Sequence, residues 1–213
     1  MSDAPKPSRT EQRKTRTRAA LVKAASSLLA EGRTDVSIQQ ITDLADVGFG
    51  SFYNHFGSKD ELFEAAVQDA LIAHSAFVNH VAQGVTDAPE RFALGVRLTC
   101  RMQRQLPEMV RVVLNTGTAI LTRAEGLGPQ ARGDIEAGMA SGRFRVSDLD
   151  LAFMVVGGAL LGALEHLDEH PDADADLAAD RLAESLLQML GVASEEAHAL
   201  AYAPLPSRGA ETA

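Results

Sequence analysis

The chain has 213 residues, 46% of them hydrophobic and 23% charged, which is typical of a folded protein with a sizeable core. A single cysteine excludes an internal disulfide framework, and the N-terminal residues lack the apolar stretch of a secretory signal. The longest uncharged apolar run, residues 151–164, is shorter than the roughly 18–20 residues that span a bilayer. The composition therefore predicts a soluble, cytoplasmic protein without a membrane partner.

The net charge of −9 is unevenly distributed. Residues 1–59 contain nine Lys or Arg and six Asp or Glu, whereas the remainder contains eleven and twenty-three. A basic end on an acidic body indicates a polyanion that contacts one side of the protein. A solvated, disordered basic tail would give the same counts, so charge alone leaves both interpretations open.

Hydrophobic periodicity predicts helices along the whole chain and no persistent strand alternation. The first helix spans residues 11–31 and stops at Gly32. Two capping-box patterns follow, one from Ser37 to Gln40 and one from Ser58 to Glu61, and each predicts a helix start.

Between these boxes lies the stretch GFGSFYNHF, residues 48–56, with room for about two helical turns. A short helix, a tight break near Asp46 and a second short helix have the dimensions of a helix-turn-helix. Phe52 and Phe56 are four residues apart, so both are expected to point inward and hold the second helix rigid. Gly48 and Gly50 leave its start without side-chain bulk, so that backbone N–H groups can approach DNA.

The later part of the chain is also expected to be helical, ending in a loose tail. Prolines, glycines and apolar periodicity place these helices at residues 88–105, 107–122, 128–140, 148–168 and 174–190.

The helix-turn-helix region, residues 37–63, carries a family resemblance. The segment SIQQITDLADVGFGSFYNHFGSKDELF resembles the DNA-binding segment of the tetracycline-repressor (TetR) family of bacterial regulators. The family pattern is met in register by Gly50, Phe52, Tyr53, His55, Phe56 and Lys59. The resemblance covers about residues 11–65, and residues 137–165 more weakly resemble the family's entry into its dimerisation helices.

Two positions depart from the family pattern. Asp46 replaces the usual turn glycine; because Asp tolerates left-handed backbone geometry, the turn is expected to survive. Phe49 stands where Lys, Pro or Gln is common, and it can offer only apolar contact, for example to a thymine methyl. Phe49 as a hydrophobic filler is the alternative interpretation.

The resemblance implies an all-α protein with an N-terminal three-helix helix-turn-helix DNA-binding domain and a larger helical effector-binding and dimerisation domain. We expect a flexible basic arm over residues 1–10, a DNA-binding domain over 11–58, an effector and dimerisation domain over 59–192, and a tail over 193–213.

The motif register predicts the contacts with double-stranded DNA. Tyr53, His55 and Lys59 are expected on phosphates, and Gln39, Phe49 and Ser51 on base edges. The full predicted set is Ser37, Gln39, Gly48, Phe49, Gly50, Ser51, Tyr53, Asn54, His55 and Lys59. Basic residues of the arm, namely Arg9, Arg13, Lys14, Arg16 and Arg18, are expected to add a salt-dependent contact.

The apolar run of residues 151–164 predicts a homodimer. It is apolar around its circumference, so one side is expected on its own body and the other on a partner subunit. The resemblance implies a four-helix interface with two-fold symmetry. The predicted interface residues are Gly157, Gly158, Leu161, Gly162, Leu182, Leu186 and Leu190.

Residues 88–141 are rich in methionine and other adaptable apolar side chains, as the walls of a pocket for a largely apolar small molecule would be. Candidate effector contacts are Phe92, Met102, Met109, Arg111, Asn115 and Phe153, with ordinary core as the alternative for each. The resemblance implies that an apolar or aromatic effector moves the helix of residues 59–81 and releases DNA.

Other chemistry is weakly supported. His166 and His170 have the spacing of a metal pair, but no glutamate follows His166 as in HExxH, so an acidic helix end is favoured. Cys100 is expected in the core. No nucleophile–base pattern is present, so the sequence predicts a non-enzymatic protein without cofactor or metal.

The predicted function is therefore a ligand-responsive transcriptional repressor. A helical interaction module, or a small-molecule-binding enzyme with an incidental basic N-terminus, is the alternative. An activator with the same DNA-binding head also remains open.

Overall fold

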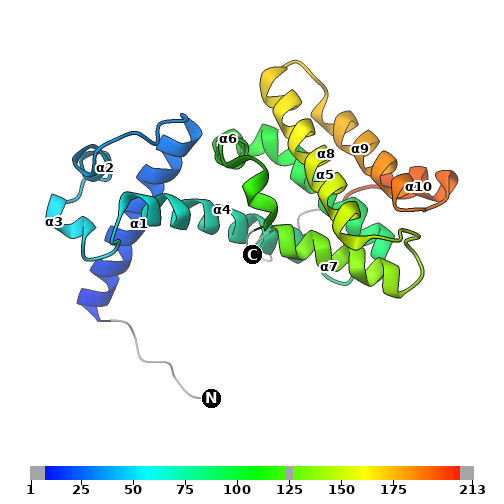
Figure 1. The fold of residues 1–213 in the computed structure, drawn as a ribbon, viewed down its shortest axis with the longest axis horizontal. Coiled ribbons are helices and arrows are strands. Elements are labelled where there is room, and N and C mark those ends of the chain that lie inside the picture. The colour runs from blue at the N-terminus through cyan, green and yellow to red at the C-terminus, as the bar shows by residue number, and fades with distance from the viewer. Residues whose placement is uncertain (1–7, 123–126, 207–213) are drawn as a thin grey trace, which may run out of the picture. The chain divides into compact units, whose positions relative to one another are not determined.

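The computed structural model describes residues 8–122 and 127–206, and all regular elements in these ranges are helices (Figure 1). The predicted all-α class is confirmed. In chain order the elements are α1 (Arg9–Ala30), α2 (Ile38–Leu44), α3 (Phe49–Phe52), α4 (Lys59–Val81), α5 (Ala88–Gln105), α6 (Pro107–Thr116), the 3-10 helix η1 (Gly117–Thr122), α7 (Leu127–Ala140), α8 (Leu149–Glu169), α9 (Ala175–Met189) and α10 (Ser194–Ala201).

The chain divides into two compact units, with the boundary inside α4 between Asp69 and Ala70. The first unit, called the N-terminal unit below, contains α1, α2, α3 and the start of α4. The second, called the helical unit, contains the remainder of α4 and all later helices.

Large side chains fill the core of the N-terminal unit. Leu21 of α1, Ile41 of α2, Phe52 of α3 and Leu62 of α4 are all fully buried. Phe56, just after α3, is also buried, and its ring packs 6.1 Å from that of Phe52. The two phenylalanines point inward as predicted and fix the short helix α3 on its neighbours.

Local hydrogen bonds define the entry and exit of α2. Oγ of Ser37 accepts from the Gln40 N–H, and Oε1 of Gln40 accepts from the Ser37 N–H, which confirms this capping box. At the other end Asp46 has a φ of 52°, in the left-handed region. The turn therefore keeps the expected geometry with an aspartate in place of glycine.

The capping box predicted at Ser58 is only partly formed. The Glu61 N–H donates to Ser58 Oγ as expected, but the Glu61 carboxylate accepts from the N–H of Gly57. The change of partner still satisfies two backbone donors at the start of α4.

The two predicted chain ends need correction. Ser8 and Glu11 form a capping box that starts α1 at Arg9, so residues 9–10 are helical; residues 1–7 of the expected arm lie outside the described range. At the other end, residues 194–201 form α10, where we expected a loose tail. Ala197 and Ala201 are fully buried, because small side chains let this helix pack closely on α9 and α5. Residues 207–213 of the tail also lie outside the described range.

In the helical unit, α5 packs against α7, α8, α9 and α10. Its apolar face joins a core cluster that includes Phe92, Phe144, Phe153 and Leu187. Its polar face is joined to α9 by ion pairs, where Nε of Arg97 lies 2.8 Å from Oδ1 of Asp180. The predicted helices of this region are confirmed with small shifts, except that residues 107–122 divide into α6 and η1 at Gly117.

Helix α8 is long and apolar enough to cross a membrane by length and composition alone. In the helical unit, however, one side of α8 packs on the other helices, with Phe153, Val156, Leu164 and Leu167 buried. The opposite side carries the exposed Leu151, Met154 and Val155.

Candidate functional site

The exposed face of the helix-turn-helix carries aromatic rings at α3. Phe49 is 47% exposed and Tyr53 57% exposed, and their rings meet edge to face with centroids 5.8 Å apart. The Tyr53 ring also packs against the ring of the buried Phe52, with centroids 5.3 Å apart. Tyr53 thus connects the exposed ring of Phe49 to the buried core that braces α3.

Polar side chains predicted to contact DNA lie on the same unit. Gln39, Gly48, Gly50 and Asn54 are exposed, whereas Ser51 and His55 are half-buried. No Cβ contact within 4 Å would restrict a side chain at Gly50. No contact within the described chain therefore requires a glycine at this position.

Two of the predicted contacts have internal hydrogen-bond partners. Nε2 of Gln39 donates to Oδ1 of Asp43 at 2.6 Å, and Nζ of Lys59 donates to the carbonyl of Val36 at 3.1 Å. Lys59 therefore also ties the start of α4 to the residue before the α2 cap. Ser37 is exposed, but its Oγ is engaged in that cap.

Positive charge gathers near His55. Arg18 of α1 lies over the Phe56 ring, 5.5 Å from its centroid, and pairs with Asp69 at 3.4 Å. Burial, followed by the charges of Lys14 and Arg18, lowers the pKa of His55. Of the residues assigned to a basic arm, Arg9, Arg13, Lys14, Arg16 and Arg18 all lie in α1 and not in a flexible segment.

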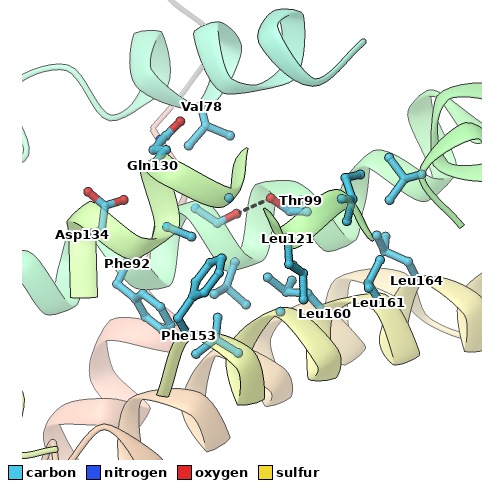
Figure 2. A pocket seen from close by; sticks show the side chains of 18 of the residues that line it. Val78, Phe92, Thr99, Leu121, Gln130, Asp134, Phe153, Leu160, Leu161 and Leu164 are labelled. Carbon is cyan, nitrogen blue, oxygen red and sulfur yellow. Dashed lines mark hydrogen bonds between the residues drawn. The ribbon is translucent and has the colours of Figure 1, made fainter. Parts of the chain in front are cut away.

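The helical unit contains a cavity of about 90 Å³ between α4, α5, α6, η1, α7 and α8. Figure 2 shows Phe153, Leu160, Leu161 and Leu164 of α8 along one wall and Gln130 and Asp134 on α7. The lining is mostly apolar. Its side chains with hydrogen-bonding groups are Thr99, Gln130 and Asp134.

The polar residues of α7 are tied to neighbouring helices. Oε1 of Gln130 accepts from Nδ2 of Asn79 at 3.2 Å and from the hydroxyl of Ser75, both on α4. Oδ1 of Asp134 accepts from Nε of Arg91 on α5 at 2.9 Å. Burial raises the pKa of Asp134, and the hydrogen bond and charge of Arg91 act in the opposite direction.

The structure retains half of the predicted effector residues at the cavity. Phe92, Met102 and Phe153 line it. Arg111 is instead half exposed, pairs with Asp168 at 3.3 Å and lies outside this lining. Met109 and Asn115 are also outside the lining.

The polar groups that do line the cavity were missed from the sequence. Gln130 and Asp134 are four residues apart, which places them on one face of α7, and this spacing was the available signal.

The predicted dimer residues divide into two groups. Gly158 and Gly162 are exposed with open space above them, on the side of α8 that carries Leu151 and Val155. Leu161 and Leu182 are half-buried.

The other predicted dimer residues are buried inside their own chain. Leu186 and Leu190 belong to the core cluster, and Gly157 lies against Leu121 and lines the cavity. Within this chain these three therefore leave almost no surface for a partner.

The remaining candidates are His166, His170 and Cys100. The rings of His166 and His170 stack at 4.3 Å, and Nδ1 of His170 lies 2.9 Å from the His166 carbonyl. Among the described residues, no cluster of three or more possible metal ligands is found. Cys100 is fully buried as predicted, and burial raises the pKa of its thiol to about 12, so it is unreactive.

A helix-turn-helix unit and a separate helical unit with an apolar cavity define a DNA-binding regulator that responds to a ligand. The chain matches the family models "Bacterial regulatory proteins, tetR family" over residues 21–66 and "Tetracyclin repressor-like, C-terminal domain" over residues 87–203. The protein belongs to the tetracycline-repressor family; it is a ligand-responsive transcriptional regulator and not an enzyme.

Solved structures agree with this membership. RolR in complex with resorcinol is 31% identical, with a TM-score of 0.65 and coverage of 92% of this chain and 98% of that chain. RolR without ligand is also 31% identical, with a TM-score of 0.70 and coverage of 88% and 98%. FadR from Bacillus subtilis in complex with stearoyl-CoA is 16% identical, with a TM-score of 0.64 and coverage of 79% and 97%, and shares the fold. A search of curated proteins found no significant match.

Proposed function

We propose that this protein is a cytoplasmic, homodimeric repressor that leaves its DNA operator when a small hydroxylated aromatic molecule binds in the helical unit. The observation that carries the proposal is the cavity, which combines apolar walls with the polar side chains of Thr99, Gln130 and Asp134. RolR, which is 31% identical over most of the chain, was solved with resorcinol, a dihydroxylated ring.

The cavity limits the size and charge of this molecule. Its volume of about 90 Å³ is smaller than that of an engineered apolar cavity of about 150 Å³ that holds benzene, so a single ring is the upper limit of size and its binding must widen the cavity. Apolar walls disfavour an ionised ligand, whose desolvation would be uncompensated. The Gln130 amide and the Asp134 carboxylate can each form a hydrogen bond with a ring hydroxyl.

On the DNA side, the exposed face of the helix-turn-helix supports the predicted register. Tyr53, His55 and Lys59 are proposed to contact phosphates, and Gln39, Phe49 and Ser51 to face base edges, with Ser37 and Asn54 beside them. Phe49 is half exposed although apolar, which supports contact with a thymine methyl over a role as core filler. Gln39 must exchange its hydrogen bond with Asp43 for one to a base.

The exposed apolar side of α8 supports the dimer. Leu151, Met154 and Val155 are 62%, 48% and 43% exposed, and Gly158 and Gly162 continue the same side. A second copy would cover this surface and, by two-fold symmetry, place two helix-turn-helix units on half-sites about one helical turn of DNA or more apart. Analytical ultracentrifugation at micromolar concentration should give the mass of a dimer, and a monomer mass would contradict the proposal.

The function is tested by fluorescence anisotropy with labelled DNA from upstream of the protein's own gene. The free protein should bind this DNA, and resorcinol should release it. Because a ligand releases DNA only by favouring the conformation that does not bind DNA, tenfold weaker binding requires about 1.4 kcal/mol of preference. DNA binding that resorcinol and related phenols leave unchanged would contradict the proposed effector class.

A further inference from the structure

A buried imidazole beside the cavity has no role in the proposed function. His74 lies on α4, is 4% exposed, and its Nε2 is 3.1 Å from Oγ1 of Thr99 on α5. Thr99 lines the cavity, and Figure 2 shows its hydroxyl hydrogen-bonded beside the apolar walls. A polar side chain that contributes to the wall is therefore held from behind by a second buried polar group.

The direction of these hydrogen bonds follows from the atoms involved. Oγ1 of Thr99 lies 2.8 Å from the carbonyl oxygen of Gly95, which can only accept, so the single hydroxyl proton of Thr99 is used there. His74 must then donate to Thr99 through an Nε2–H group. Burial lowers the pKa of His74 to about 4, so the ring is neutral near pH 7. A neutral ring carries a single N–H proton, and the bond to Thr99 places that proton on Nε2.

After these two bonds, Thr99 has no proton to offer but can still accept through its second lone pair. We propose that His74 is a positioning residue that makes Thr99 a pure hydrogen-bond acceptor, so that the cavity selects effectors carrying a hydroxyl or N–H group at this point. The inference rests on the proposed function and specifies which chemistry the site accepts. An ether or carbonyl oxygen in the same place would meet a lone pair without a proton between them.

Gln130 provides a matched contrast within the cavity. Its Oε1 accepts from Asn79 and Ser75 of α4, so its amide N–H groups are what it can offer to a ligand. A hydroxyl and an ether oxygen both accept such a bond, and Gln130 therefore cannot distinguish them. Substitution of Gln130 should weaken both kinds of ligand together, whereas substitution of Thr99 should change their ratio.

The experiment compares resorcinol with 3-methoxyphenol and 1,3-dimethoxybenzene by isothermal titration calorimetry. Wild-type protein should prefer resorcinol, and Thr99→Val, of similar shape but without the acceptor, should reduce this preference by about tenfold. Thr99→Ser should retain the preference, and Gln130→Leu should lower affinity without changing the ratio. His74→Gln, which keeps an N–H donor, should retain more of the preference than His74→Phe. Helical circular dichroism and DNA affinity without ligand verify that each variant is folded.

A second measurement does not depend on any ligand. In protein labelled with ¹⁵N-histidine, the imidazole signals that disappear in His74→Gln should show a neutral ring with the proton on Nε2 near pH 7. A proton on Nδ1, or an unchanged resorcinol preference in Thr99→Val, would overturn the inference while leaving the proposed function intact. Failure of all three ring compounds to bind wild-type protein would overturn both.

Discussion

The two units of this regulator use large apolar side chains in opposite ways. In the N-terminal unit, Phe52 and Phe56 are buried and fill the space between short helices. In the helical unit, Phe92 and Phe153 border a cavity. A surface that must match DNA needs a fixed geometry, whereas a binding site for a small molecule needs space. Phenylalanine serves both purposes: it fixes the geometry where its neighbours enclose the ring, and it lines a cavity where they do not.

The strongest test of this contrast is the same substitution in both units. Phe52→Ala should destabilise the N-terminal unit by about 3–5 kcal/mol, because a fully buried ring leaves a new void, and it should abolish DNA binding. Phe153→Ala should cost less, since one side of its ring already faces empty space and has fewer contacts to lose. The chain has two tyrosines and no tryptophan, with Tyr53 in one unit and Tyr202 in the other. Each substitution is therefore measured by urea unfolding with tyrosine fluorescence. A Tyr202→Phe background leaves Tyr53 to report on the N-terminal unit, and a Tyr53→Phe background leaves Tyr202 to report on the helical unit. Equal losses of stability in Phe52→Ala and Phe153→Ala would refute the contrast.

Acid should weaken the helical unit through His74. The pKa of this residue is lowered from 6.5 to about 4 in the folded chain, so the unfolded chain binds the proton first. The stabilisation is thus complete above pH 6.5 and is lost as the pH falls toward 4, and the loss at pH 4.5 should be about 2–3 kcal/mol. Urea unfolding followed by Tyr202 fluorescence in the Tyr53→Phe background, at pH 7.5 and 4.5, measures this loss of stability. His74→Gln does not titrate and should lose less stability over this range; an identical loss in both proteins would show that His74 is not responsible.

In the N-terminal unit, the left-handed Asp46 offers a smaller and opposite change. At a φ of 52°, Asp46→Gly removes a steric cost and should stabilise the unit by up to about 1 kcal/mol, whereas Asp46→Ala should destabilise it by a similar amount. Thermal unfolding followed by the Tyr53 signal distinguishes the two. Gly50→Ala is a useful control, because Gly50 has no close neighbour and the change should leave stability nearly unaltered while weakening DNA binding.

The smallest predicted effect concerns salt. Lys59→Ala should weaken DNA binding about equally on all sequences and reduce the slope of log affinity against log salt by about one unit. Lys23→Ala removes the same charge from an exposed position of α1 outside the predicted contacts and should leave the slope unchanged. Anisotropy titrations between 50 and 200 mM salt, taken as roughly the useful range, measure both. An unaltered slope in Lys59→Ala would mean that this lysine serves only its bond to Val36.

Much of the N-terminal unit was predictable because its determinants are local in the sequence. Capping residues, the left-handed turn at Asp46 and the i, i+4 spacing of Phe52 and Phe56 are all contained in one short segment. The helices from α5 onward could likewise be placed from prolines, glycines and apolar periodicity. These signals specify an element and its buried face without reference to distant residues.

The cavity and the proposed dimer surface depend instead on which helices pack together. Periodicity marks Leu186 and Leu190 as buried, but it cannot tell burial in the same chain from burial against a partner. Arg111 was a reasonable polar candidate on an apolar helix, and only the position of Asp168 shows that it faces outward. The alanine-rich α10 resembles a tail until its contacts with α9 and α5 are known.

The close packing of Gly157 against Leu121 has a consequence for how such a regulator evolves. A Cβ at position 157 would lie 2.5 Å from Cδ2 of Leu121, a flexible side chain that also lines the cavity. Any larger residue there must push Leu121 aside and so reshape the space open to an inducer. A single codon in the helical unit can therefore redirect which molecule a descendant senses, while the operator it recognises is inherited unchanged.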